Sequence, residues 1–191
     1  EQFMSNRFSR TIGVVPAAGQ GNRLFPHPHP KELLPVGSQE TEIDGRSERR
    51  PKAVSQYLIE GMMRGGIRRF FFILGSGKCD IMEYYGSGTS HGIEAAYLYQ
   101  DRSRGMPLAI DLVYPWLRGD ETIVMGMPDT IIEPPTALAQ LLESHKGWEA
   151  DLTLGLFQTD TAAKFGMIGI DQDFNVTEHV DKPTSTELQW L

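Results

Sequence analysis

The chain has 191 residues, which is enough for one sizeable domain with its own hydrophobic core and short for two. Apolar residues make up 40% and charged residues 23%, as in soluble globular proteins, so wholesale disorder is not expected. The formal net charge of −7 argues against a surface that holds nucleic acid by its phosphates. Small phosphorylated ligands stay compatible with this charge, because a few local cations can hold one.

Cysteine content and apolar runs indicate a soluble, cytoplasmic protein with no membrane partner. Cys79 is the single cysteine, so the chain has neither an internal disulfide nor a cysteine zinc site. No apolar run approaches the ~20 residues that cross a bilayer. The first ten residues, EQFMSNRFSR, also lack the apolar core of a signal peptide.

Strand-like and helix-like patterns alternate along the chain. Short apolar runs predict five strands, over residues 11–17, 68–74, 92–100, 121–127 and 150–158. Helical spacing predicts helices over 51–66 and 134–147, the second capped by Gly147, and weaker ones over 79–86 and 106–117. This alternation predicts an α/β fold, a Rossmann-like and mostly parallel sheet with helices on both faces. Ligands of such sheets bind at the carboxyl ends of the strands.

Two segments depart from the alternation. Residues 38–50, SQETEIDGRSERR, are almost wholly polar and predict an exposed, mobile insertion loop. Residues 166–180 contain two alternating runs around DQDFN, which predict a small hairpin near the C-terminal end.

The segment after the first strand, AAGQGNRLFPHPHPK, has the features of a phosphate cradle. Ala18, Gly19 and Gly21 let backbone N–H groups approach a ligand closely, and successive N–H groups in such a turn form an anion nest. Arg23 and Lys31 add two cations, of which the guanidinium is a planar fork suited to phosphate oxygens. We therefore predict a triphosphate site here.

A plain glycine-rich turn with a solvated arginine is the alternative, and glycine pairs alone do not exclude it. The pattern is not the dinucleotide fingerprint, because Leu24 stands where a third glycine is needed. It is not a Walker loop either, because no G-K-[ST] follows. His27 and His29 lie in an extended loop with no third ligand nearby, so a zinc site is not predicted.

The order G-x-G-N-R-L-F-P followed by P-K-E-L-L-P-V resembles the signature of the sugar-1-phosphate nucleotidyltransferases, or NDP-sugar pyrophosphorylases, of the glucose-1-phosphate thymidylyl/uridylyltransferase type. GMPDTI, YQDRSRGMPLAI and FGMIGIDQDFNVTEHVDKP resemble later segments of that family, so the likeness covers nearly the whole chain. It implies a single catalytic domain over residues 1–191 with the nucleotide-diphospho-sugar transferase fold. The family continues further, with a second metal-binding aspartate, so we expect the chain to lack its C-terminal part.

The resemblance implies transfer of a nucleotidyl group from an NTP to a sugar 1-phosphate, which gives an NDP-sugar and pyrophosphate. It assigns catalytic roles to Arg23 on the β and γ phosphates, to Lys31 near the α-phosphate and to Lys182 on the sugar phosphate. The other implied residues are Ala18, Gly19, Gly21, Asn22, Gln100 and Gly105 for the nucleotide, Gly166 and Asp181 for the sugar, and Asp129 for Mg²⁺.

Each assignment has a plainer alternative. Lys31 could be a surface lysine, Asp129 a turn or N-cap aspartate, and Asp181 with Lys182 a surface ion pair of little energetic weight. The chain also departs from the family pattern, because Asn22 replaces a threonine or serine, Asp181 replaces a glutamate, and the spacer before Lys31 is about two residues shorter.

Two functions from different classes follow. The first is the enzyme, with UTP or dTTP as the NTP, because the amide of Gln100 can satisfy both a donor and an acceptor of a pyrimidine base. The second is a nucleotide- or sugar-phosphate-binding regulatory protein on the same fold with weak or no turnover. The architecture is compatible with a homo-oligomer and does not require one.

Overall fold

A computed structural model of the chain describes residues 10–21, 29–102 and 105–184. Its contacts separate into two compact units, residues 1–150 and 151–191, and each is described by itself. The single catalytic domain expected from the sequence stays a prediction. Within the described residues, no helix is both long and apolar enough to cross a membrane.

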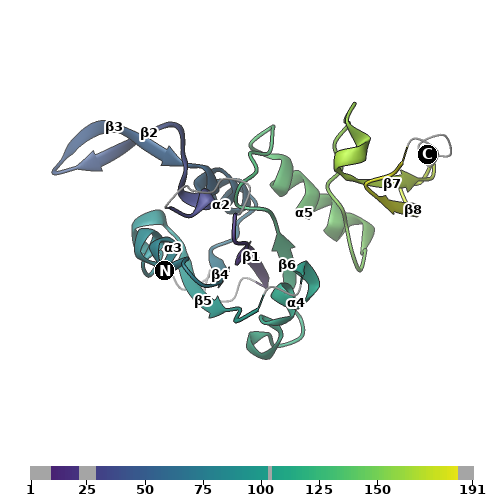
Figure 1. The fold of residues 1–191 in the computed structure, drawn as a ribbon, viewed down its shortest axis with the longest axis horizontal. Helices are drawn as coiled ribbons and strands as arrows, with labels where there is room; N and C mark the ends of the chain where they lie inside the picture. Colours follow the sequence, from purple (N-terminus) through teal and green to yellow (C-terminus); the bar gives the residue numbers. More distant parts are fainter. Residues whose placement is uncertain (1–9, 22–28, 103–104, 185–191) are drawn as a thin grey trace. The chain divides into compact units, whose positions relative to one another are not determined.

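A four-stranded parallel sheet forms the centre of the first unit (Figure 1). Its strands are β1 (Thr11–Ala17), β4 (Arg69–Leu74), β5 (Glu94–Tyr99) and β6 (Thr122–Met125). They lie in the order β5-β4-β1-β6, and both β4 and β6 pair with β1 in parallel register. Four of the five predicted strands and the α/β class are therefore confirmed.

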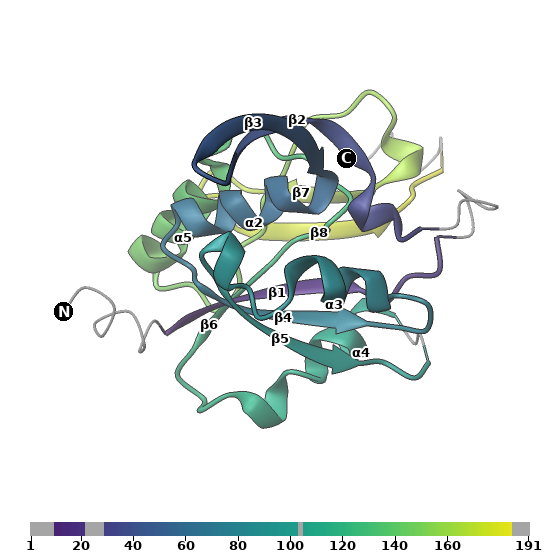
Figure 2. The same ribbon diagram turned by 90° about the vertical axis from the view of Figure 1, so that its left-hand side faces the viewer.

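Helices cover both faces of this sheet, as predicted (Figure 2). All seven residues of β1 are buried, and because successive side chains point to opposite faces, Val15 and Ala17 belong to one core cluster while Ile12 and Val14 belong to the other. The first cluster packs against α2 (Val54–Arg64), α3 (Cys79–Tyr85) and α5 (Ala137–Trp148), and the second against α4 (Met106–Asp111).

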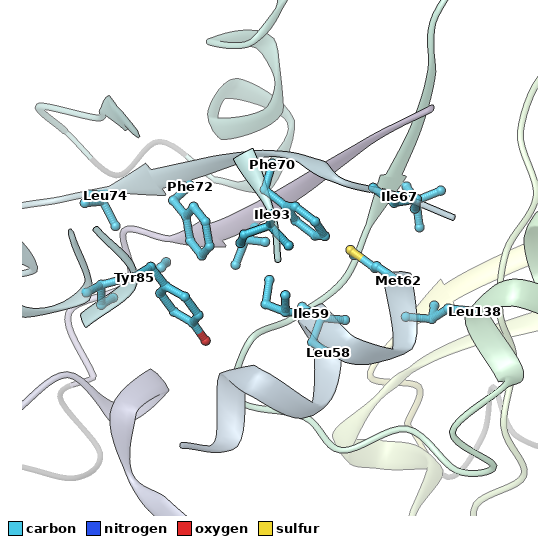
Figure 3. Close-up of a cluster of buried hydrophobic side chains, with 14 of the residues drawn as sticks. Leu58, Ile59, Met62, Ile67, Phe70, Phe72, Leu74, Tyr85, Ile93 and Leu138 are labelled. Atoms are coloured by element: carbon cyan, nitrogen blue, oxygen red, sulfur yellow. The ribbon is translucent and has the colours of Figure 1, made fainter. Parts of the chain in front are cut away.

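Aromatic side chains dominate the larger core cluster. Phe72 stacks on Tyr85 with ring centroids 4.9 Å apart, and Phe70, Leu58 and Met62 pack around them (Figure 3). Each fully buried Phe or Leu contributes about 1.5–3 kcal/mol relative to exposure. This cluster fixes α2 and α3 on β4, and thereby fixes the loops that leave the carboxyl ends of the strands.

Local signals set the ends of α2 and α5. The Gln56 side chain accepts the backbone N–H of Ala53 at 3.0 Å at the start of α2, and Gly65 and Gly66 follow its end. Helix α5 runs through the predicted cap Gly147 and ends at Trp148, with Glu149 in the left-handed region at φ 51°. The predicted cap position is therefore wrong, because a non-glycine residue took the left-handed conformation.

Residues 38–50 form most of a β-hairpin, which differs from the irregular insertion that their polarity predicted. Strands β2 (Pro35–Ile43) and β3 (Arg46–Ala53) pair antiparallel and project from the sheet in Figure 1. The tip residues Asp44 and Gly45 both have positive φ, 50° and 73°, as in the tight turns whose twist suits two strands. The Asp-Gly pair was the signal, and the polar composition concealed it.

The second unit contains the predicted C-terminal hairpin, formed by β7 (Gly166–Ile170) and β8 (Val176–Asp181). The carboxylate of Asp171 accepts the backbone N–H groups of Asp173 at 2.9 Å and Asn175 at 2.8 Å, which closes the turn. The strand predicted over 150–158 is wrong, because no residue of this segment is in a strand. Its alternating leucines fit a strand, but Leu152, Leu154 and Leu156 are all exposed, and alternation alone does not supply a pairing partner.

Short 3₁₀ turns complete the described structure. They cover Lys31–Leu33, Thr89–His91, Tyr114–Trp116 and Ala162–Lys164.

Candidate functional site

The carboxyl edge of the sheet contains a topological switch point. The chain leaves β1 for β4 on one side, whereas β6 lies on the other side of β1, so the strand order reverses between β1 and β6. Ligands of open parallel sheets bind in the crevice outside such a point. Ala18, Gly19 and Gly21 follow β1 directly, and Asp129 follows β6 within four residues.

The backbone after β1 has the freedom that the cradle prediction requires. Gly21 has φ +67°, which glycine adopts without strain. A Cβ atom added to Gly19 or Gly21 would meet no atom of the described residues within 4 Å. Asn22, predicted to bind the nucleotide, and Arg23, predicted to hold its phosphates, lie outside the described residues.

Lys31 and Asp129 form an ion pair across 98 residues of sequence. The Nζ atom of Lys31 lies 2.5 Å from Oδ2 of Asp129, and the side chains are 22% and 31% exposed. Lys31 opens the 3₁₀ turn after Pro30, and Asp129 lies in a turn in which the N–H of Thr130 donates to the carbonyl of Met127. The structure thus brings together two residues that the sequence assigned separately to catalysis and to a metal.

Next to this pair lies a buried ion pair that the sequence analysis missed. Nζ of Lys78 is 2.7 Å from Oε2 of Glu32, and these side chains are only 6% and 2% exposed. Glu32 follows Lys31 directly, and Lys78 lies in the loop after β4. The available signal was a lysine shortly after a predicted parallel strand, because the loops that follow parallel strands lie at the edge of the sheet where ligands bind.

The predicted base-binding residues lie beside β5. Gln100 follows this strand directly, is 8% exposed, and donates its backbone N–H to the carbonyl of Leu74 at 2.7 Å. Gly105 precedes α4 with φ +95°. Gln100 therefore lies at the same edge of the sheet as the glycines after β1.

The second unit brings together the residues assigned to the sugar. Gly166 and Asp181 are register partners across the β7–β8 hairpin. The backbone N–H of Lys182 donates to the carbonyl of Phe165 at 3.0 Å, and its Nζ lies 3.8 Å from Oδ2 of Asp181, with both side chains 66% exposed. A cavity of about 980 Å³ within this unit is lined by Gly166, Phe157 and Phe165 among others.

Metal-binding groups are sparse in the part of the chain that the structure describes. It contains no group of three or more His, Cys, Asp or Glu side chains suited to a metal ion. His29, part of the histidine pair in the sequence, has Nδ1 3.6 Å from Oδ2 of Asp80. The single carboxylate of Asp129 at the switch point could hold an oxygen-preferring ion only together with oxygens from a ligand.

Comparison with known proteins assigns the family. The family model for nucleotidyl transferases matches residues 12–190, nearly the whole chain. The chain belongs to the nucleotidyl transferase family. The recognition made from the glycine, arginine and lysine pattern is therefore confirmed at the level of the family.

Similar proteins include other nucleotidyl transferases. The chain is 29% identical over 174 residues to the low-salt glycan biosynthesis nucleotidyltransferase Agl11 of Haloferax volcanii, covering 90% of this chain and 44% of that protein. It is 22% identical over 181 residues to a glucose-1-phosphate thymidylyltransferase of Neisseria meningitidis, covering 93% and 58%. The chain thus spans about half the length of these curated relatives.

A solved structure supports the fold. UDP-glucose pyrophosphorylase complexed with UDP-glucose matches with a TM-score of 0.70 at 19% identity, covering 93% of this chain and 70% of that one. At this identity the likeness concerns the fold alone.

Proposed function

We propose that this protein transfers a nucleotidyl group from UTP or dTTP to a sugar 1-phosphate, giving an NDP-sugar and pyrophosphate. The observation that carries the proposal is the meeting of Lys31 and Asp129 at the switch point, with Asp129 after β6 at the same edge of the sheet as the glycines that follow β1. Family membership and the names of the relatives, which include a glucose-1-phosphate thymidylyltransferase, support it.

In the proposed reaction, an oxygen of the sugar phosphate attacks the α-phosphorus of the NTP. A new P–O bond forms there, and the bond from the α-phosphorus to the oxygen bridging to the β-phosphate breaks, so pyrophosphate leaves with the electron pair. Such transfers depend on alignment and on neutralisation of charge rather than on covalent help from the protein. The cations that the sequence assigns to the site meet this requirement.

Lys31 would neutralise charge on the α-phosphate, and Arg23 would hold the leaving phosphates. Lys182 would hold the sugar phosphate, while Asp181 would accept a hydroxyl of the sugar. Gln100 would pair with the pyrimidine base through its amide. The backbone at Gly19 and Gly21 would donate N–H groups to the triphosphate.

Mg²⁺ is the cofactor that fits best. Asp129 offers a hard oxygen ligand at the edge where phosphates would bind, and Mg²⁺ is commonly held by one or two carboxylates together with substrate phosphates. When bound, the ion would neutralise phosphate charge. Because Lys31 contacts the same carboxylate, Asp129 must share its oxygens between the lysine and the ion.

The test is a coupled pyrophosphate-release assay of the purified chain with each of four NTPs and several sugar 1-phosphates, with and without Mg²⁺. We expect release with UTP or dTTP and one hexose 1-phosphate, and its loss on chelation. No release with any pair would overturn the enzymatic proposal. NTP binding measured by calorimetry in that case would establish the regulatory alternative.

A further inference from the structure

We propose that the loop of residues 75–78, after β4, positions Ala18 and Lys31, which lie at the two ends of the segment 18–31 that the sequence predicts to bind phosphate, and that Lys78 is the positioning residue for Lys31. The inference rests on the proposed function, since it assigns Lys31 to the reaction. Two independent contacts carry it, one to each end of the segment.

The first contact is the buried ion pair between Lys78 and Glu32. Its 2.7 Å separation lies out of solvent, because the two side chains are 6% and 2% exposed. Removing two charges from water is costly, and each ion is tolerated in the interior only while the other compensates it. The pair therefore ties the Lys31–Leu33 turn to the loop after β4 in one arrangement.

The second contact joins the same loop to the start of the segment. A Cβ atom at Gly75 would lie 2.8 Å from the carbonyl oxygen of Ala18 and 3.3 Å from its Cα. Only glycine therefore lets the two backbones lie this close, where β1 and β4 end side by side at the Ala17–Leu74 register pair. The loop of residues 75–78 therefore contacts Ala18, just before the glycines of the segment, and Glu32, just after its lysine.

Other contacts also hold this turn, and the Lys31 ammonium itself pairs with Asp129. Leu33 packs against the larger core cluster, and the backbone N–H of Val54 donates to the carbonyl of Leu34 at 2.9 Å. Both contacts lie at the end of the turn or just beyond it, because Leu33 is its last residue. Glu32 is adjacent to Lys31, so its link to Lys78 restrains the position of the Lys31 ammonium beside Asp129.

The test replaces both charges at once, with the double variant Glu32→Met and Lys78→Met. Apolar residues of similar volume commonly keep a protein folded where a single replacement would leave a buried ion uncompensated. The matched control is Lys52→Met with Glu60→Met. It removes another ion pair of the same 2.7 Å length, between residues that we place outside the site.

We expect the test variant to keep its Tm close to the wild type and to lose about tenfold in kcat, with less than about threefold change in the KM for the NTP. The control should retain its kcat. Labelling of the Lys31 amine by an acylating reagent, followed by mass spectrometry, should be faster in the test variant than in the wild type and the control.

Unchanged kcat and unchanged Lys31 labelling in the test variant would overturn the positioning role. The labelling measurement needs no turnover, so it decides the inference by itself if the wild-type chain releases no pyrophosphate. Absence of pyrophosphate release from the wild-type chain would overturn the proposed function. The positioning of Lys31 by Lys78 would then be decided by the labelling rates alone.

Discussion

Replacing Asp129 with asparagine separates the chemistry proposed for the site from its contribution to stability. Asparagine keeps the shape of the side chain and can still accept a hydrogen bond from Lys31. It removes the negative charge that pairs with the ammonium at 2.5 Å and that would bind Mg²⁺. Stability and turnover should therefore respond very differently.

The expected magnitudes follow from exposure and role. The two side chains are 22% and 31% exposed, and ion pairs open to solvent contribute about 0–1 kcal/mol. For a chain of this length, 1 kcal/mol corresponds to about 2–4 °C in Tm. Loss of the proposed Mg²⁺ ligand should lower kcat/KM at least about tenfold, or about 1.4 kcal/mol of transition-state stabilisation.

The assay compares pyrophosphate release and thermal unfolding for Asp129→Asn and Asp120→Asn. Asp120 is a matched control, because it lies before the same strand, β6, and pairs with Arg10 at 3.3 Å near the opposite end of the sheet. We expect Asp120→Asn to leave turnover unchanged. Wild-type turnover in Asp129→Asn would remove this carboxylate from the mechanism, and a Tm loss well beyond about 4 °C would refute the stability argument.

Three further predictions concern the fold. Gly13→Ala places a Cβ 2.5 Å from a ring carbon of Phe70 in the middle of β1, so overpacking should cost about 1–3 kcal/mol in denaturant unfolding; an unchanged midpoint would contradict this packing. Tyr85→Phe removes a buried 2.7 Å hydrogen bond to Ser55 and should cost about 1–3 kcal/mol, whereas a neutral result would mean that water replaces the hydroxyl. Burial lowers the pKa of His91 below its ordinary 6.5. As the pH falls, the imidazole is therefore protonated at a higher pH in the unfolded chain than in the folded one. The stability linked to His91 is therefore complete above about pH 6.5 and declines at lower pH, and the Tm of His91→Phe should fall less than that of the wild type between about pH 7 and pH 5.5.

Local sequence patterns predicted most of the regular elements of the first unit. Continuous apolar runs mark β1 and β4, and helical stripes mark α2 and α5. Each predicted range lies within a few residues of the observed element, because strands that are buried on both faces require such continuous apolar runs. The β2–β3 hairpin was missed, since its stability rests on a two-residue turn rather than on apolar content. The strand predicted over residues 150–158 failed for the opposite reason, because its apolar residues alternate as in a strand but the segment has no strand partner among the described residues.

The site was predictable in its parts but not in its contacts. The sequence singled out Lys31 and Asp129, yet their ion pair depends on β6 lying beside β1, and strand order is not written in any local pattern. The buried pair of Glu32 and Lys78 was beyond reach for the same reason. Charged residues are rarely buried, so a sequence gives no ground to expect this burial until the partner is known.

The β2–β3 hairpin offers a practical consequence for engineering. Pro35 and Ala53 are register partners, so the two ends of the hairpin lie side by side within the connection between β1 and α2. The exposed tip at Asp44 and Gly45 is therefore a natural place to carry a short epitope or a fluorescent label, since loop tips tolerate added residues. Such a graft would report on the molecule without altering the path that links β1, Lys31 and α2.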